Sequence, residues 1–354
     1  MLTYKLKKEI MKKKKNNPKR SLLMLVLAII AVLVGTTTYA FLSPLSSSSE
    51  KEYVYIDNDD DADSIRRKIS DISGVAAGKA FDILAGATGY YDHIRSGRYG
   101  IAPDEPTLQV FRKIRNGSQD PVMLTIPSVR TLDRLAHEIS KKLMMNEDEL
   151  YGALIDPEVC KSFDLDTLTI QCLFIPETYE IYWNIPVEKF LERMNKERKT
   201  FWTEERKKKA NEAGMREEEV VTLASIVDEE TANNGEKPMI AGMYINRLKT
   251  GMPLQADPTI KYALKDFKLK RIYHNHLDVK SPFNTYRNIG LPPGPIRIPS
   301  IAGIDAVLNH SKSDYLYMCA KEDFSGTHNF AVTYQEHLKN AARYSAALNK
   351  RGIK

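Results

Sequence analysis

Three consecutive acids follow an apolar run in the segment LASIVDEET. The pattern predicts a helix over residues 219–234, in which each side chain is turned by about 100° from the one before. This rotation places Glu230 on the apolar stripe that contains Leu223. Asp228 and Glu229 fall toward the polar side, where solvated acids belong. Glu230 is therefore the acid that we expect to point into the protein.

A carboxyl group on a core-facing stripe loses hydration, so its charged form is disfavoured and its pKa rises. An acid that keeps its proton near neutral pH can donate it to a leaving group. Glu230 is accordingly the candidate catalytic residue. The alternative is a structural acid that hydrogen-bonds a backbone group or pairs with Arg247.

Two later segments, LQADPT and FNTY, are rich in side chains that hydrogen-bond sugar hydroxyls and N-acetyl groups. Turn chemistry explains each of these residues singly, but their density predicts a polar binding cleft. The candidate substrate-binding residues are Gln255, Asp257, Thr259, Asn284 and Tyr286.

A metal hydrolase is a competing hypothesis, built on the HNH triplet of His274, Asn275 and His276 together with His328. Histidines two residues apart without an acidic partner motif are more often surface residues than zinc ligands. The sequence therefore predicts neither a metal nor a cofactor.

The segment most easily assigned is residues 21–42, which contain no charged side chain. At about 1.5 Å per residue such a helix spans roughly 33 Å, enough for a hydrocarbon core of about 30 Å. Residues 1–20 hold nine Lys or Arg against one Glu, so the positive-inside rule predicts a cytoplasmic tail. We expect a single-pass inner (cell) membrane protein with its catalytic domain periplasmic or extracytoplasmic. A cleaved signal peptide is the alternative, although the apolar run is long for one.

The net charge of +6 arises in that tail, because the remaining residues carry a net charge of −2. A basic groove for nucleic acid is therefore not expected.

Three cysteines, Cys160, Cys172 and Cys319, fit no metal-binding spacing. A disulfide between Cys160 and Cys172 and three unpaired thiols are both compatible with the sequence.

The elements that must position the acid form an α+β pattern. A strand, a polar turn and a helix in residues 54–70 recur in residues 124–140, which predicts a small module with a duplicated element. The expected organisation, in order, is a tail (1–20), a transmembrane helix (21–42), a linker (43–51), a membrane-proximal region (52–185) and a catalytic domain (186–354).

Several ordered motifs between about residues 217 and 340 carry a family resemblance. They are LASIVDEET, GEKPMIAGMYINRLKTGMPLQADPTIKYAL, NTYRNIGLPPGPIRIPS and GTHNFAVTYQEH. They resemble the YceG-like family of endolytic murein transglycosylases, membrane-anchored enzymes that cut nascent peptidoglycan strands. The resemblance implies that the membrane-proximal region is LysM-like. It also implies that Glu230, the second acid of the family's E-x-E-T motif, is catalytic, with Asp228, Asn246, Arg247 and His328 in supporting roles.

The expected reaction is non-hydrolytic. Glu230 would protonate the bond between N-acetylmuramic acid and N-acetylglucosamine, and the muramic C6 hydroxyl would close onto C1 as a 1,6-anhydro ring. A hydrolytic muramidase, with Asp257 as second carboxylate, and a non-catalytic peptidoglycan-binding scaffold are the alternatives. Expected partners are peptidoglycan strands, the inner membrane and peptidoglycan synthases or divisome proteins.

Overall fold

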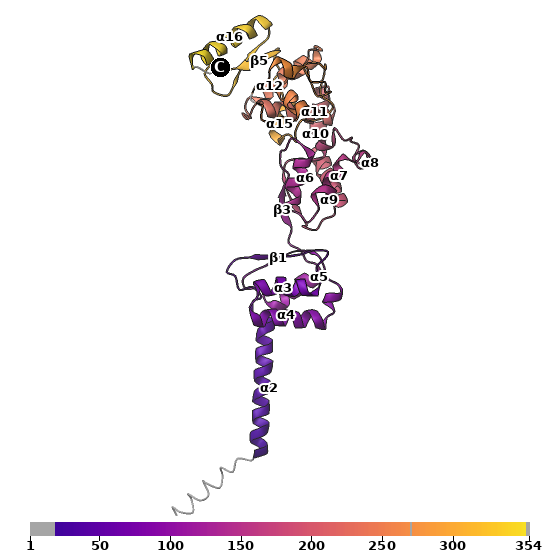
Figure 1. Ribbon diagram of the computed structural model, residues 1–354, viewed down its shortest axis with the longest axis vertical. Coiled ribbons are helices and arrows are strands. Elements are labelled where there is room, and N and C mark those ends of the chain that lie inside the picture. Colours follow the sequence, from indigo (N-terminus) through magenta and orange to yellow (C-terminus); the bar gives the residue numbers. More distant parts are fainter. Residues whose placement is uncertain (1–17, 270, 352–354) are drawn as a thin grey trace, which may run out of the picture. The chain divides into compact units, whose positions relative to one another are not determined.

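The computed structural model describes residues 18–269 and 271–351. The chain forms two compact units, Met1–Pro121 and Val122–Lys354, whose elements are labelled in Figure 1. Most of the predicted cytoplasmic tail, residues 1–17, lies outside the described residues. The predicted mixture of helices and strands is confirmed in both units.

The first unit begins with helix α2 (Pro18–Leu42). Its stretch Lys19–Leu42 is long and apolar enough to cross a membrane, and the side chains of residues 19–39 are all exposed. Because such a surface is costly in water, the helix has the properties of a membrane span.

The stretch predicted as a linker is built into the first unit directly after α2. Leu45 is fully buried, and its N–H donates to the carbonyl of Glu105 at 3.1 Å. The carbonyl of Ser43 accepts from the N–H of Thr107 at 2.9 Å. These bonds leave little free chain between the apolar helix and the folded unit.

The rest of the first unit is a strand–helix–helix–strand arrangement followed by one more helix. The elements in order are strand β1 (Glu52–Ile56), helix α3 (Ala62–Ile72), helix α4 (Val75–Ala87), strand β2 (Gly97–Ile101) and helix α5 (Thr107–Asn116). A 3-10 turn at Tyr90–Asp92 lies between α4 and β2. The two strands pair antiparallel, with Val54 opposite Tyr99. Their inward side chains pack on Ile65, Ile69 and Phe111 in one core.

The second unit starts with a similar series of elements, with three helices instead of two between its paired strands. The elements in order are strand β3 (Val122–Thr125), helix α6 (Leu132–Ser140), helix α7 (Glu147–Ile155), helix α8 (Pro157–Lys161) and strand β4 (Thr178–Ile181). A 3-10 turn at Ile170–Leu173 lies between α8 and β4. Strand β3 pairs antiparallel with β4. The two predicted copies therefore each acquire a closing strand of their own and lie in separate units, not in one module.

The domain boundary expected between residues 185 and 186 differs from the boundary between the compact units at 121 and 122. The reason is packing. Leu124 and Ile139 belong to the same hydrophobic core as Leu223 on the acid-bearing helix.

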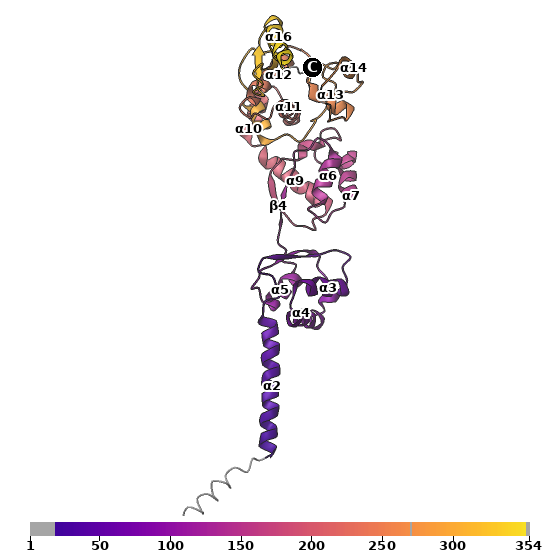
Figure 2. The ribbon, with the colours of Figure 1, turned by 60° about the vertical axis from the view of Figure 1, so that its left-hand side comes forward.

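The remaining elements of the second unit are mostly helical. They are α9 (Val187–Phe201), α10 (Glu204–Glu212), α11 (Glu217–Glu230), α12 (Lys237–Lys249), α13 (Asp257–Leu264), α14 (His274–Leu277), α15 (Ile301–Leu308), β5 (Tyr317–Ala320), β6 (His328–Ala331) and α16 (Tyr334–Lys350). Strands β5 and β6 form an antiparallel hairpin. Figure 2 shows α11 among the surrounding helices, and α11 packs against α12, α13 and α15.

Helix α11 carries the three acids and is buried on every side. All eight residues from Val220 to Val227 are buried, so the helix has no solvated face along this stretch. It ends at Glu230, four residues earlier than predicted, because Thr231 adopts an extended conformation.

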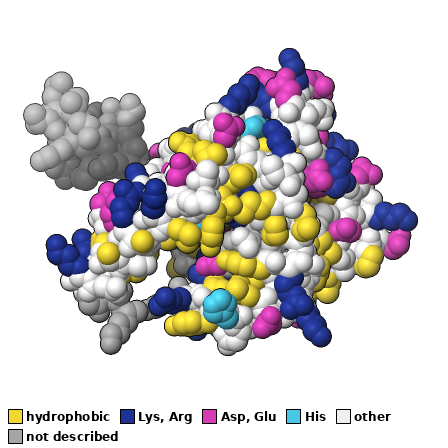
Figure 3. Space-filling view, turned by 90° about the horizontal axis from the view of Figure 1, so that it is seen from above, with side chains coloured by type: hydrophobic (Ala, Val, Ile, Leu, Met, Phe, Trp, Pro, Cys, Tyr) yellow, Lys and Arg dark blue, Asp and Glu magenta, His cyan; other side chains and the backbone are white. Residues whose placement is uncertain are grey.

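The surface seen in Figure 3 mixes hydrophobic side chains with charged groups of both signs.

Candidate active site

Glu230, the last residue of α11, lies at a cavity of about 220 Å³ in the second unit. The cavity walls come from α12, the loop before α13, the loop around residue 286 and the β5–β6 hairpin. The lining residues are Glu230, Met243, Tyr244, Arg247, Gln255, Asp257, Tyr286, Met318, Cys319, Ala320 and His328. The sequence-based interpretation of Glu230 as an inward-pointing acid is consistent with this position.

Burial of the Glu230 carboxyl group raises its pKa to about 7. The hydroxyl of Tyr244 donates a hydrogen bond of 2.8 Å to Oε1, which stabilises the carboxylate and opposes the rise. The negative charge of Asp257 raises the pKa further, whereas His328 lowers it. A carboxyl group with this pKa exists in both protonation states near neutral pH, so it can donate a proton and later accept one.

A second carboxylate of the cavity, Asp257, is the first residue of α13 and is exposed. It accepts a hydrogen bond of 2.6 Å from the hydroxyl of Tyr286. Gln255, two residues earlier, is exposed and has a φ of 50°, a left-handed conformation that is unusual for a residue with a side chain. Gln255, Asp257 and Tyr286 thus present polar groups at one cavity, as the sequence predicts for substrate contacts.

His328 enters the cavity from β6 and is held by Glu236. The backbone N–H of His328 donates to Oε1 of Glu236 at 2.6 Å, and its Nδ1 lies 3.0 Å from Oε2. With Nδ1 engaged, Nε2 is the ring nitrogen left for a ligand.

Arg247 lines the cavity, but two of its three side-chain nitrogens donate to the protein backbone. Its Nε donates to the carbonyl of Leu316 at 2.6 Å and one terminal nitrogen to that of Leu254 at 2.6 Å. No ion pair joins it to Glu230 among the residues that the structure describes. Asn246, its neighbour on α12, likewise donates to the carbonyls of Ser313 and Tyr315. Both residues fix the chain that leads into β5.

Thr259 and Asn284 do not line the cavity, and both are fully buried. The Thr259 hydroxyl donates to the carbonyl of Ala256 at 2.6 Å and lies 2.8 Å from the hydroxyl of Thr285. The Asn284 amide donates to the carbonyls of Leu277 and Val279. The two side chains do not present polar groups to the cavity as expected for substrate contacts. They instead form hydrogen bonds that hold the loops carrying Asp257 and Tyr286.

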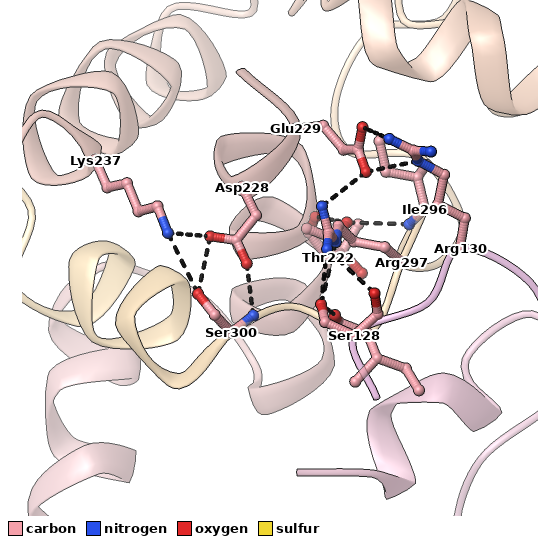
Figure 4. A network of polar contacts seen from close by, with 11 residues as sticks. Ser128, Arg130, Thr222, Asp228, Glu229, Lys237, Ile296, Arg297 and Ser300 are labelled. Carbon is pink, nitrogen blue, oxygen red and sulfur yellow. Dashed lines mark hydrogen bonds and ion pairs between the residues drawn. The ribbon is translucent and has the colours of Figure 1, made fainter. Parts of the chain in front are cut away.

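The expectation that Asp228 faces water is wrong. Its carboxylate forms an ion pair of 2.7 Å with Lys237, and only 4% of its side chain and 6% of that of Lys237 are exposed. It also accepts from the N–H of Ser300, which caps α15 (Figure 4). Gly303 makes room for this carboxylate, since a Cβ there would lie 2.5 Å from Oδ1. Asp228 therefore ties α11 to α12 and α15.

Glu229 is not a solvated acid either, and it bridges two arginines (Figure 4). Arg130 binds it through two hydrogen bonds of 2.8 and 2.9 Å, and Arg297 adds one of 2.9 Å. Arg297 also donates to the backbone carbonyl of Ser128. Each of the three acids at the end of α11 therefore forms a hydrogen bond or an ion pair within the protein. The side of α11 that the helical projection assigned to solvent is covered by other parts of the chain.

A larger cleft of about 1030 Å³ lies elsewhere in the second unit and does not include Glu230. Arg130, Lys265, Arg297, Tyr262 and Phe267 are among its lining residues. The carboxylate that meets two of these cations, Glu229, is held in ion pairs. The smaller cavity is therefore the better candidate for acid–base chemistry.

The HNH triplet lies at the exposed helix α14, and His276 accepts a hydrogen bond from the N–H of Tyr273. Within residues 18–269 and 271–351, no group of three or more His, Cys, Asp or Glu side chains is arranged to hold a metal ion.

Comparison with known proteins places this chain in a family. The YceG-like family matches residues 54–343, which is most of the chain. The chain belongs to the YceG-like family. The matched residues include parts of both compact units.

Curated relatives and a solved structure of the YceG-like family agree with this. A Bacillus subtilis protein named endolytic murein transglycosylase is 27% identical over 311 residues, covering 81% of this chain and 82% of that protein. One of the same name from Streptococcus pneumoniae is 25% identical and covers 86% of this chain, which spans only 60% of that relative. A putative YceG-like protein from Listeria monocytogenes, solved by crystallography, aligns with a TM-score of 0.54 at 28% identity over 82% of this chain and 99% of its own. The expected class of enzyme, a lytic transglycosylase, is thus confirmed at the level of the family.

Sequence reasoning missed two residues that the site depends on. Tyr244 bonds the candidate acid, and Lys237 neutralises Asp228. Both lie on α12, and neither belongs to a local pattern that points at α11. Only the packing of α12 against α11 brings them there.

Proposed function

We propose that this chain is a membrane-anchored endolytic murein transglycosylase in which Glu230 acts first as general acid and then as general base. The observation that supports it most is a carboxyl group with a pKa of about 7 beside a polar cavity. Burial favours the protonated form of Glu230, and the hydrogen bond from Tyr244 stabilises the carboxylate that forms when the proton leaves.

In the first step Glu230 protonates the oxygen that links N-acetylmuramic acid to N-acetylglucosamine. The bond from C1 to that oxygen breaks, and the muramic N-acetyl group assists as positive charge develops at C1. In the second step the Glu230 carboxylate takes the proton of the muramic C6 hydroxyl while O6 bonds to C1. The products are a free hydroxyl on N-acetylglucosamine and a 1,6-anhydro-muramic end, and Glu230 recovers its proton.

The substrate would be held by the polar groups that line the cavity. Gln255, Tyr286 and His328 are the proposed contacts for sugar hydroxyls and N-acetyl groups. Asp257 either positions Tyr286 or, in a hydrolytic muramidase, serves as the second carboxylate. The muramidase is the second candidate because Asp257 lines the same cavity as Glu230.

The proposed anchor is α2, with the N-terminus in the cytoplasm and the chain that follows α2 outside. Its support is the exposed apolar length of α2 and the excess of Lys and Arg before it in the sequence. A membrane-bound enzyme meets strands as they are polymerised, so peptidoglycan synthases or divisome proteins are proposed as partners. The two segments that begin and end with a paired strand, residues 52–101 and 122–181, are proposed as LysM-like glycan-binding elements.

The test compares the full-length Glu230→Gln variant with a matched Glu229→Gln control. Both changes replace one carboxylate by its amide on adjacent residues of α11. With uncross-linked glycan strands as substrate, wild type should release fragments lighter by one water than hydrolysis products. Glu230→Gln should lose about 10²–10⁴-fold in rate, the usual contribution of a general acid, and Glu229→Gln much less.

Products with only reducing ends would identify a hydrolase. A fully active Glu230→Gln variant would remove Glu230 from the chemistry. Binding of strands without any cleavage by wild type would leave the scaffold as the function.

A further inference from the structure

Helix α4 of the first unit presents an apolar face that no described residue covers. Its inner face packs Ala77, Phe81 and Ala85 into the core. Val75 and Ile83 lie on the outer face with exposed fractions of 79% and 59%. Outside α2, Val75 is the most exposed large hydrophobic residue among those described.

The outer face forms one continuous arc. At about 100° per residue, an arc of about 120° contains six exposed residues of α4. They are Val75, Ala76, Lys79, Ile83, Gly86 and Ala87. One cation and five apolar or small residues are unusual for a helix face in contact with water, and typical of a helix at a membrane interface.

This face lies where α2 leaves the unit. Helix α4 contacts α2, and in both ribbon views it lies at the edge of the first unit that adjoins α2 (Figures 1 and 2). Ala40 and Phe41, in the last turn of α2, are partly buried, whereas residues 19–39 are exposed. The apolar helix therefore ends at its contact with the unit.

The connection after α2 is short and fixed, which limits how far α4 can be from the lipid. Besides the bonds of Leu45 and Ser43, the N–H of Ser47 donates to the carbonyl of Ile72 at 3.0 Å, two residues before the cap of α4. A flexible linker would let the unit move away from the bilayer, but no free linker is present at this point.

We propose that the exposed face of α4 rests in the interface of the phospholipid bilayer that α2 spans. Val75 and Ile83 insert at the boundary between headgroups and acyl chains, and Lys79 extends its ammonium group to lipid phosphates. This inference rests on the proposed membrane span of α2. It assigns to the first unit a second membrane contact that orients it on the bilayer surface.

Lipid is favoured over a protein partner because α4 contacts a helix of membrane-spanning length. A protein partner would have to bind within reach of headgroups, and a second copy of this chain would have to bury the same arc.

The test uses the full chain in phospholipid nanodiscs with single reporter cysteines. In a Cys319→Ser background, a polarity-sensitive fluorophore is placed by Val75→Cys or Ile83→Cys. Tyr39→Cys on α2 reports the span, and Ile289→Cys, 70% exposed in the wild type, is the control in the second unit. Quenching by a lipid with a nitroxide near its headgroup is compared with quenching by aqueous iodide.

Probes at 75 and 83 should be quenched by the nitroxide lipid and lose most of their iodide quenching, whereas the probe at 289 should show the reverse. Iodide quenching at 75 and 83 as strong as at 289 overturns the inference. Protection from iodide without lipid quenching overturns it too, since it indicates a protein contact. The probe at 39 separates the two proposals, because a water-exposed 39 would reject the membrane span itself.

Discussion

The hydroxyl of Tyr244 donates a 2.8 Å hydrogen bond to Oε1 of Glu230, joining the middle of α12 to the last residue of α11. Burial of the Glu230 carboxyl group and this hydrogen bond act on its pKa in opposite directions. Their balance leaves the pKa at about 7, where one residue can both give and take a proton.

Replacing Tyr244 by Phe should move the pH dependence of activity to higher pH. The lost hydrogen bond stabilised the carboxylate, so the pKa of Glu230 should rise by about one unit and the acid form should persist to higher pH. The measurement is the alkaline limb of kcat/KM against pH. Tyr286→Phe, which removes the hydrogen bond to Asp257 instead, is the control. An unchanged limb in Tyr244→Phe would show that this bond does not set the pKa.

Glu230→Gln should make stability less dependent on pH. The pKa is raised from 4.5 to about 7 by folding, so the folded state binds the proton more tightly. The resulting stabilisation is complete below about pH 4.5 and is lost as pH rises through 7. The variant should therefore gain up to roughly 3 kcal/mol relative to wild type between pH 4 and pH 8. Denaturant unfolding at both pH values checks this, and equal differences at the two would contradict it.

Removing either partner of the buried pair between Asp228 and Lys237 should destabilise the fold without abolishing catalysis. Asp228→Asn or Lys237→Met alone leaves an uncompensated buried charge, at a cost of about 3–5 kcal/mol. The double variant should lose less than the sum of the two. Lys189→Met, at an exposed pair with Glu192, is the control and should cost about 0.5 kcal/mol or less.

The measurements for this pair are the free energy of unfolding and kcat at a temperature where all variants are folded. An Asp228→Asn variant that is stable but inactive would give Asp228 a chemical role.

Cys319 should be the one thiol that reacts quickly in the native protein. Cys160 and Cys172 are 0% and 1% exposed, whereas Cys319 is only partly buried, so a reagent can reach Cys319 without unfolding of the chain. Burial raises the pKa of all three thiols, so access and not thiolate content distinguishes them. All three cysteines are free thiols in the structure, which decides against the disulfide alternative. Titration with a thiol reagent should detect one fast thiol in the folded protein and three after denaturation without reductant. One thiol after denaturation would indicate a disulfide.

The sequence by itself determined the features that depend on local geometry. Helical rotation separated Glu230 from Asp228 and Glu229, because the angle between successive side chains is a property of the backbone. The apolar length of α2 and the recurrence of a strand and helix near residues 54 and 124 are equally local.

The tertiary structure decided what covers each face. No pattern within α11 indicates that Lys237, Arg130 and Arg297 would neutralise the two acids on its polar side. Thr259 and Asn284 are of the same chemical type as Gln255 and Tyr286. Their side chains are nevertheless buried and donate hydrogen bonds to backbone carbonyls of the loops. Exposure and partners depend on which distant segments pack together, so residue type and spacing leave them open, whereas the direction in which Glu230 points is fixed by the helix that carries it.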